Sequence, residues 1–283
     1  MHISIHPFTE AELEVTNEML KAAYNVPLSR KESLCRYLSL QTAGAFVARH
    51  ETTVIGFGGA MDYGPFAYIG LMAVHPRMQR RGVGGLILER LLAWLDERRC
   101  PTALLDASPV GAPLYTRYGF TAEDTTVVLR LTQRVCLPHQ LSESVSHLSE
   151  ADIPAVVAFD APYFGADRQA ILTSYWIDDP QRAFIVRDSN RRIAGYLFAQ
   201  PTTLGPWLAN TVEDAERLLV QALALPFAGE PNVFVSAHNT DALELLNRYG
   251  FNQQRTLSHM RRGNQIQRSR HTLLYGQASL GFG

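Results

Sequence analysis

Hydrophobic and polar positions repeat one plan in the two halves of the chain. Each half opens with a short alternating strand, followed by a hydroxyl residue with an acid three positions later: Thr9 with Glu12, and Ser149 with Asp152. A hydroxyl N-cap with an acid at that spacing is typical of a helix start, so we expect a helix after each pair. The two openings lie about 140 residues apart, which is the period of a domain rather than of a short repeat.

Two further segments recur in the same order. AFVAR at 45–49 matches AFIVR at 183–187, and each is followed by a polar turn and a second apolar run, which predicts two β-hairpins. LYTRYGF at 114–120 then matches LLNRYGF at 245–251. The shared order of elements predicts two domains built on one α/β plan.

The length of the chain agrees with this, because 283 residues amount to about two units of roughly 150 residues. We place the domains at residues 1–135 and 136–283, with the join in the weakly patterned segment between Leu131 and Ser146. Hydrophobic residues make up 46% of the sequence, enough for ordinary globular cores, and the net charge of -1 provides no global field for a polyanion or a membrane surface. Nucleic acid and membranes are therefore disfavoured as partners.

The sequence lacks the patterns of secreted, membrane and metal-binding proteins. The opening MHISIHPFTE lacks the basic and apolar segments of a secretion signal, and no stretch of the sequence reaches the ~18 apolar residues of a membrane span, so we expect a cytoplasmic protein. Cys35, Cys100 and Cys136 are widely spaced and form neither a disulfide framework nor a zinc-ligand pattern. We expect no metal, and the sequence does not indicate an oligomeric state.

The two halves differ between the hairpin and the RYGF segment. In the first half an apolar strand ending at Pro76 leads to QRRGVG at 79–84 and then to a helix with leucines on one face. Consecutive backbone N–H groups at a helix start, with glycines and two arginines, are suited to bind phosphate. The sequence contains neither a GxxxxGK[ST] nor a GxGxxG string, which disfavours nucleoside triphosphates and dinucleotides. In the second half an acidic helix start at 212–216 stands in place of the basic loop.

These segments resemble a known family. VHP at 74–76 leading to QRRGVG resembles motif A of the GNAT acetyltransferase superfamily, and APLYTRYGF at 112–120 resembles its motif B at a matching distance. The resemblance covers residues 1–131 with both motifs, and the second half through RYGF and strand order. It implies two tandem GNAT-like domains, each a twisted mixed sheet flanked by helices, of which the second lacks the CoA pyrophosphate loop.

The resemblance further implies that acetyl-CoA is the cosubstrate. The loop would hold its pyrophosphate, and the preceding strand its pantetheine through backbone groups, so that the side chains of that strand are free to serve as ordinary core. The cofactor-binding residues expected on this basis are Met72, Ala73, Val74, Gln79, Arg80, Arg81, Gly82, Val83, Gly84, Gly85 and Ser108. Ser108 has an alternative use as the cap of the following helix, which we favour.

Acetyl transfer needs a proton donor for the departing thiolate. By resemblance this is Tyr115, four residues before the Gly-Phe of motif B, since a phenol held near the sulfur can protonate it. Tyr118 is expected to pack, because Tyr249 repeats it in the second half. The second half has Leu246 where the first has Tyr115, which predicts an inert copy.

The general base is left open among Asp62, Asp106, His75 and a water molecule, because spacing selects none of them. Asp62, Asp160 and Arg168 are the candidate acceptor-binding residues. For the last two, a local ion pair that stabilises a loop is an equal alternative. The function expected overall is transfer of acetyl from acetyl-CoA to a primary amine of a small molecule by direct attack. The alternatives are a catalytically silent CoA-binding sensor or interaction protein, and a protein or peptide N-acetyltransferase.

Overall fold

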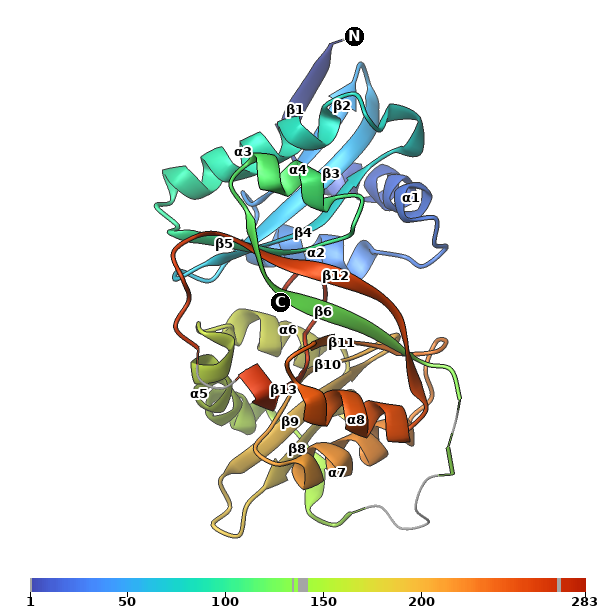
Figure 1. Cartoon of the computed structure of the whole chain (residues 1–283), viewed down its shortest axis with the longest axis vertical. Helices are drawn as coiled ribbons and strands as arrows, with labels where there is room; N and C mark the ends of the chain where they lie inside the picture. Colours follow the sequence, from blue (N-terminus) through green and yellow to red (C-terminus); the bar gives the residue numbers. More distant parts are fainter. Residues whose placement is uncertain (1, 134, 137–141, 269–270) are drawn as a thin grey trace.

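The computed structural model describes residues 2–133, 135–136, 142–268 and 271–283 (Figure 1). In these residues the strands form one sheet of 13 strands in the order β1-β2-β3-β4-β5-β12-β6-β11-β10-β9-β8-β7, with β13 paired to β10. The strands are β1 (Ile3–Pro7), β2 (Ala45–His50), β3 (Thr53–Asp62), β4 (Ala67–Val74), β5 (Thr102–Ala107), β6 (Thr121–Leu131), β7 (Val145–His147), β8 (Ala183–Arg187), β9 (Ile193–Gln200), β10 (Thr203–Ala209), β11 (Asn232–Ser236), β12 (Phe251–Gly263) and β13 (Leu274–Gly276).

Eight α-helices cover the two faces of this sheet in the described part of the chain. They are α1 (Leu13–Tyr24), α2 (Lys31–Leu40), α3 (Val83–Glu97), α4 (Ala112–Arg117), α5 (Ile153–Phe164), α6 (Gln169–Asp178), α7 (Val212–Leu223) and α8 (Thr240–Arg248). Both predicted capping boxes are present, each opening a short 3₁₀ turn that continues into α1 or α5. The two predicted hairpins are present as β2 with β3 and β8 with β9.

The two halves are built alike, as the repeated pattern predicts. In each half four antiparallel strands are followed by one that pairs in parallel with the fourth: β5 with β4, and β11 with β10. In the first half α3 and α4 pack on one face in a core that includes Leu88, Leu91 and Tyr115. In the second half α7 and α8 form the equivalent core, which includes Leu218 and Leu246. The fold is therefore α/β with a mixed sheet flanked by helices in both halves.

The last strand of each half is exchanged. β6 follows the first half in sequence but pairs with β11 of the second, while β12 follows the second half and pairs with β5 of the first. β6 and β12 also pair with each other, so one continuous sheet crosses the molecule (Figure 1). Much of the predicted join between Leu131 and Ser146 lies outside the described residues, and the division at 135 and 136 stays a prediction.

A core shared by both halves lies on the face covered by α1, α2, α5 and α6. The end of the described chain passes through it, between the halves (Figure 1). Tyr37 donates to the carbonyl of Gly281 at 3.0 Å, and Tyr63 donates to the carbonyl of Phe282 at 2.7 Å. The two halves are therefore held together by the exchanged strands and by this last segment. Among the described helices, none has the length and apolar character needed to cross a membrane.

Candidate active site

The loop between β4 and α3 contains several backbone amides that donate to no other residue in the described part of the chain. Arg80 and Gly82 adopt left-handed conformations, with φ of 58° and 83°. The amides of Arg80, Gly82, Val83, Gly84 and Gly85 donate no hydrogen bond to any other described residue. Such amides at the positive end of a helix dipole form an anion-binding site. The loop has the local geometry that its sequence predicts for a phosphate site.

β4 and β5 separate next to this loop. They pair in parallel at two positions, Ala67 with Ala103 and Tyr68 with Leu104, and pair no further. β4 then bulges at Leu71, whose φ is 51°, and continues toward the loop, while β5 stays paired with β12. A gap therefore opens between the later residues of β4 and those of β5.

Two amides of β4 face this gap. The amide of His75 donates to the carbonyl of Ile55 on β3 at 2.9 Å, so His75 and Ala73 are the residues whose backbone groups are directed toward β3. Because successive residues of an antiparallel strand direct their amides to opposite sides, those of Met72 and Val74 point into the gap. This is the arrangement that the sequence predicts for backbone donors to a ligand lying along β4.

Tyr115 lies on α4, close to the start of α3. Its side chain is 8% exposed and packs edge-on against Phe120, with ring centroids 5.9 Å apart. An added Cβ on Gly84 would lie 3.3 Å from the Leu114 side chain, which shows how closely α4 approaches the loop. The Tyr115 hydroxyl makes no hydrogen bond with a described residue, and burial raises the pKa of its phenol. Tyr115 therefore remains a protonated donor beside the loop.

Tyr118 has a different environment on the same helix. Its hydroxyl donates to Glu89 of α3 at 2.6 Å, and an added Cβ on Gly85 would come within 2.9 Å of that hydroxyl. Tyr249 repeats the contact in the second half by donating to Glu216 of α7 at 2.8 Å. Tyr118 thus fastens α4 to α3, as its repetition in the sequence indicates.

A buried polar cluster joins β5 to the exchanged strands. Asp106 accepts hydrogen bonds from Tyr68 and, at 2.6 Å, from Thr126, and it lies 3.1 Å from Nδ1 of His259. Burial raises the pKa of Asp106, but the hydrogen bonds from His259, Thr126 and Tyr68 outweigh it and hold that pKa below its usual value. Asp106 was among the open candidates for the base. His259 lies far from it in sequence, and no pattern in the sequence points to it.

Comparisons with known proteins agree with this geometry. A model described as "Acetyltransferase (GNAT) family" matches residues 12–120, and one described as "Acetyltransferase (GNAT) domain" matches residues 156–276. The chain belongs to the GNAT acetyltransferase family. It is an acyltransferase with two tandem GNAT domains, and GNAT enzymes generally use acetyl-CoA.

Solved structures show the same fold over the whole chain. A protein from Pyrococcus horikoshii assigned to the acetyltransferases is 29% identical, with a TM-score of 0.88 over 99% of this chain and 96% of that one. A GCN5-related N-acetyltransferase from Sphaerobacter thermophilus is 15% identical, with a TM-score of 0.70 over 94% of this chain and 98% of that one. A GCN5-related N-acetyltransferase from Anabaena variabilis is 13% identical, with a TM-score of 0.57 over 92% of this chain and 72% of that one. No curated protein was found to match the sequence.

Within the first GNAT domain, the structure brings most of the predicted cofactor residues together around the loop and the gap. Gln79 Nε2 donates to the carbonyl of Val74 at 3.1 Å and so ties the loop to β4. Ser108 accepts from the amide of Gly111 at 3.1 Å in the turn before α4, but the N-cap of α4 is Gly111, so Ser108 supports the turn rather than capping the helix. Asn239 is itself the N-cap of α8 and accepts from Ala242 at 3.0 Å. A CoA-binding role for Ser108 stays a prediction.

The three predicted acceptor residues do not gather at this site. Asp62 ends β3 at the far end of the β3–β4 hairpin from the loop, where it pairs with Arg98 at 2.6 Å. Asp160 and Arg168 form a two-point ion pair, with both hydrogen bonds at 2.8 Å, in the buried region between the halves. Tyr196 donates to the same Asp160 at 2.5 Å. This geometry matches the stabilising alternative, and an acceptor role for the pair stays a prediction.

The second GNAT domain has no comparable opening. β10 and β11 pair in parallel at Thr203 with Asn232 and then separate, but β13 lies in the resulting space. β13 pairs with β10, and the amide of Gln277 donates to the carbonyl of Phe234 on β11 at 3.0 Å. Leu246, at the position of Tyr115, is fully buried core. The chain itself fills the space that is open in the first domain.

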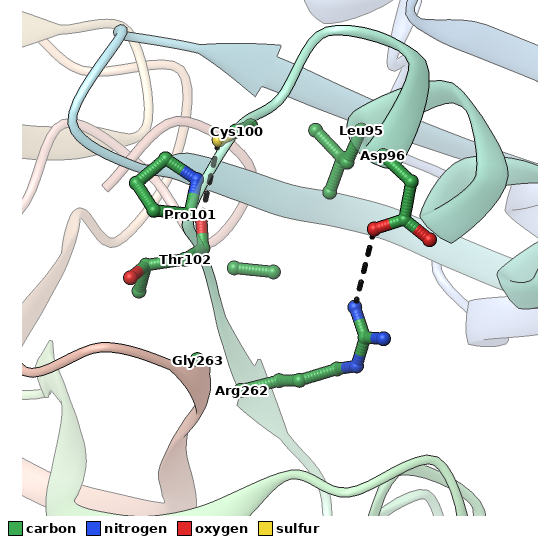
Figure 2. A pocket seen from close by; sticks show the side chains of 8 residues that line it. Leu95, Asp96, Cys100, Pro101, Thr102, Arg262 and Gly263 are labelled. Atoms are coloured by element: carbon green, nitrogen blue, oxygen red, sulfur yellow. Dashed lines mark hydrogen bonds and ion pairs between the residues drawn. The ribbon is translucent and has the colours of Figure 1, made fainter.

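Two of the cavities among the described residues lie away from the glycine loop. One of about 490 Å³ lies over β6, β11 and β12 and is lined by residues that include His259, Asp124 and Arg268. The other, of about 310 Å³, lies at the C-terminal end of α3, where Arg262 reaches toward Asp96 at 3.9 Å (Figure 2). Because a helix of this length spans about 22 Å, the second cavity is separate from the glycine loop.

Proposed function

We propose that the first GNAT domain binds acetyl-CoA and transfers the acetyl group to a primary amine of a small molecule. One observation carries this proposal: at the start of α3, amides that donate no hydrogen bond to a described residue lie beside the place where β4 and β5 cease to pair, close to a buried, protonated Tyr115. The amides suit the pyrophosphate, the gap suits the extended pantetheine arm, and the phenol suits the leaving sulfur.

In this mechanism the neutral amine attacks the thioester carbonyl directly. The amides of Met72 and Val74, which face the gap, donate to the carbonyl oxygen as negative charge develops on it. The carbon–sulfur bond breaks, the phenol of Tyr115 protonates the departing thiolate, and the proton lost by the attacking nitrogen restores the phenol. Burial supports this role, since the raised pKa of Tyr115 keeps the phenol protonated at neutral pH.

A small-molecule acceptor is supported by what covers the gap. On the face away from α3, the segment ending at Gly283 packs against β4, so closely that a Cβ on Gly70 would meet the Cα of Gly281 at 2.2 Å. A cavity of about 490 Å³ lies over β6, β11 and β12, beyond β5 from the gap, and is lined by polar residues of both domains. A volume in this range holds a small molecule rather than a polypeptide segment.

Substitution of Gly82 tests the loop. Gly82 has φ of 83° and space for a side chain, so Gly82→Val retains the fold at a cost of about 1–2 kcal/mol, while its side chain covers the amides. We expect CoA affinity by isothermal titration to fall about 100-fold, in line with the loss of about 2.7 kcal/mol of binding free energy.

Gly64→Val is the matched control. Gly64 has φ of 91° and equally open surroundings, but lies in the β3–β4 turn away from the loop. It should lower stability by a similar amount and leave CoA affinity intact. Equal CoA affinity in both variants would overturn the assignment of the loop. Release of free thiol with a panel of amines then separates an enzyme from a sensor, since a sensor binds CoA without releasing thiol from acetyl-CoA.

A further inference from the structure

The polar cluster around Asp106 lies on the face of the sheet opposite α3. Leu105 and its alternate neighbours on β5 pack with α3, whereas Leu104 packs with Phe164 of α5. Since side chains alternate along a strand, Asp106 shares the face of Leu104. The members of the cluster come from β4, β5, β6 and β12, and His259 belongs to the second domain. The cluster exists because the last strands are exchanged.

Asp106 fixes the orientation of the His259 ring. Its hydrogen bonds favour the ionised carboxylate, and a carboxylate beside Nδ1 favours the proton on that nitrogen. Nε2 is then left as a lone-pair acceptor. Within the described residues Nε2 has no hydrogen-bond partner, and His259 is 9% exposed and lines the cavity. Asp106 thus fixes the ring through Nδ1 and leaves Nε2 available to a ligand.

The cluster lies where the gap begins. Tyr68 is the last residue of β4 that pairs with β5, and its hydroxyl reaches across to Asp106. The backbone amides assigned to the acetyl group, at Met72 and Val74, follow a few residues later on β4. In the sheet β5 lies between β4 and β12, so His259 reaches the edge of the gap across β5, through Asp106 and with its ring 6.2 Å from that of Tyr68. The loop and Tyr115 contact α3 on the other face of the sheet.

We propose that His259 is the general base of acetyl transfer and that Asp106 positions it, an inference that rests on the proposed function. The ammonium form of the acceptor gives one proton to Nε2 of His259, and the neutral amine attacks the thioester carbon. The carbon–nitrogen bond forms, the carbon–sulfur bond breaks, and the thiolate takes the phenol proton of Tyr115. The proton lost by the new amide nitrogen returns to the tyrosinate, and His259 releases its proton to solvent.

The charged and titratable groups around His259 come from every element that packs against it. They are Tyr68 of β4, Asp106 of β5, Glu123 and Asp124 of β6, His238 after β11, Arg261 of β12, and Arg268. Glu123 pairs with Arg261, and Asp124 pairs with His238 at 2.8 Å. These pairings leave Asp106 as the carboxylate that acts directly on the His259 ring.

His259→Gln is the direct kinetic test, because glutamine can keep a donor toward Asp106 but cannot accept the proton. With the best acceptor from a panel of alkylamines, amino sugars and amino acids, we expect kcat at pH 7 to fall about 100-fold. In the variant kcat then rises about tenfold per pH unit as the amine itself loses its proton, while KM for acetyl-CoA is unchanged. A variant with the pH profile of the unaltered protein would overturn the proposal.

His238→Gln is the comparison variant, since His238 lines the same cavity and also pairs with an aspartate, Asp124, although its side chain is exposed where that of His259 is buried. In this variant kcat should fall toward low pH as it does in the unaltered protein, whatever the effect of the substitution on KM for the acceptor. If both substitutions changed the pH dependence of kcat equally, the change would come from the charge of the cavity, and His259 would not be the base. Failure of the unaltered protein to release thiol with any amine would instead count against the proposed function.

The orientation of the ring can be measured without an acceptor. Long-range ¹H–¹⁵N spectra of the imidazoles, with His259→Gln for assignment, should show the unaltered His259 protonated at Nδ1 and bare at Nε2. Asp106→Asn should shift the proton toward Nε2 and lower kcat with little change in KM for acetyl-CoA. A proton on Nε2 in the unaltered neutral ring would exclude His259 as the base.

Discussion

No described strand lies between β4 and β5 beyond their two paired positions, whereas β13 lies between β10 and β11, although both gaps arise where two parallel strands pair briefly and separate. In the second domain β13 inserts into the gap and forms backbone hydrogen bonds with both of its walls. Unpaired backbone groups at such a gap require a partner. In one domain the proposed partner is a ligand, and in the other it is the end of the same chain.

The start of the helix that follows each gap also differs between the two domains. α3 follows a basic, glycine-rich loop in which the amides of Arg80, Gly82, Val83, Gly84 and Gly85 donate no hydrogen bond to a described residue. α7 begins with Thr211, whose hydroxyl accepts from the amide of Asp214 at 3.1 Å, and with Glu213 and Asp214 in its first turn. A capped, acidic helix start repels the phosphates that a bare, basic one attracts. The two differences together account for our proposal that the first copy holds the CoA site and the second serves as a structural support.

The largest effect should come from changing the filled gap. Gly205 has φ of 142°, and an added Cβ would lie 2.1 Å from the carbonyl oxygen of Gln277. Gly205→Ala should therefore lower the free energy of unfolding by about 3–5 kcal/mol, through backbone strain and displacement of the last segment. Denaturant unfolding measures this, with Gly229→Ala as a control because Gly229 has open surroundings. Equal stability of the two variants would show that β13 does not fill the gap tightly.

Local patterns made much of this comparison predictable. The capping boxes, the hairpins, the basic loop and its acidic replacement are each defined by neighbouring residues, and the structure contains all of them. The different surroundings of Tyr115 and Tyr118 are also foreshadowed, because Tyr249 repeats one of them and Leu246 replaces the other. A residue that both halves share, such as Tyr118, is expected to serve packing, whereas one that only the first half has, such as Tyr115, is a candidate for chemistry.

Long-range pairing was not predictable. β6 and β12 have similar patterns and either could complete either half, so nothing local selects the exchanged arrangement. The contact of His259 with Asp106 depends on that exchange, and so does the cavity that His259 lines. The insertion of β13 joins segments that are likewise distant in sequence. These features are set by strand register across the whole sheet.

Tyr115→Phe tests the chemistry that the second domain lacks. We expect kcat to fall about 100-fold with CoA affinity unchanged, because the variant removes the proton donor and little else. Tyr118→Phe on the same helix should keep kcat and lose about 1 kcal/mol of stability with its hydrogen bond to Glu89. Full activity in Tyr115→Phe would remove its role as the acid.

The pH dependence of kcat in the unaltered protein is a second test of Tyr115 as the proton donor. Burial raises the pKa of the Tyr115 phenol, and a raised pKa keeps the protonated form present at higher pH. An acid in this state continues to donate as pH rises through about 10, where an ordinary tyrosine ionises. We therefore expect kcat, measured by thiol release at saturating substrate, to show no alkaline loss below about pH 10. A decline centred near pH 8 or 9 would point to a different donor.

The smallest effect should come from removing the cap of α7. Thr211→Ala frees the amide of Asp214 and should lower the free energy of unfolding by about 1 kcal/mol, measured by denaturant unfolding. It should not create a CoA site, because Glu213 and Asp214 remain in the first turn and β13 still fills the adjacent gap. Titration of Thr211→Ala with CoA should thus give the single-site stoichiometry of the unaltered protein. A second binding event would show that a free helix start alone is enough, and that the open gap contributes less than the comparison of the two domains implies.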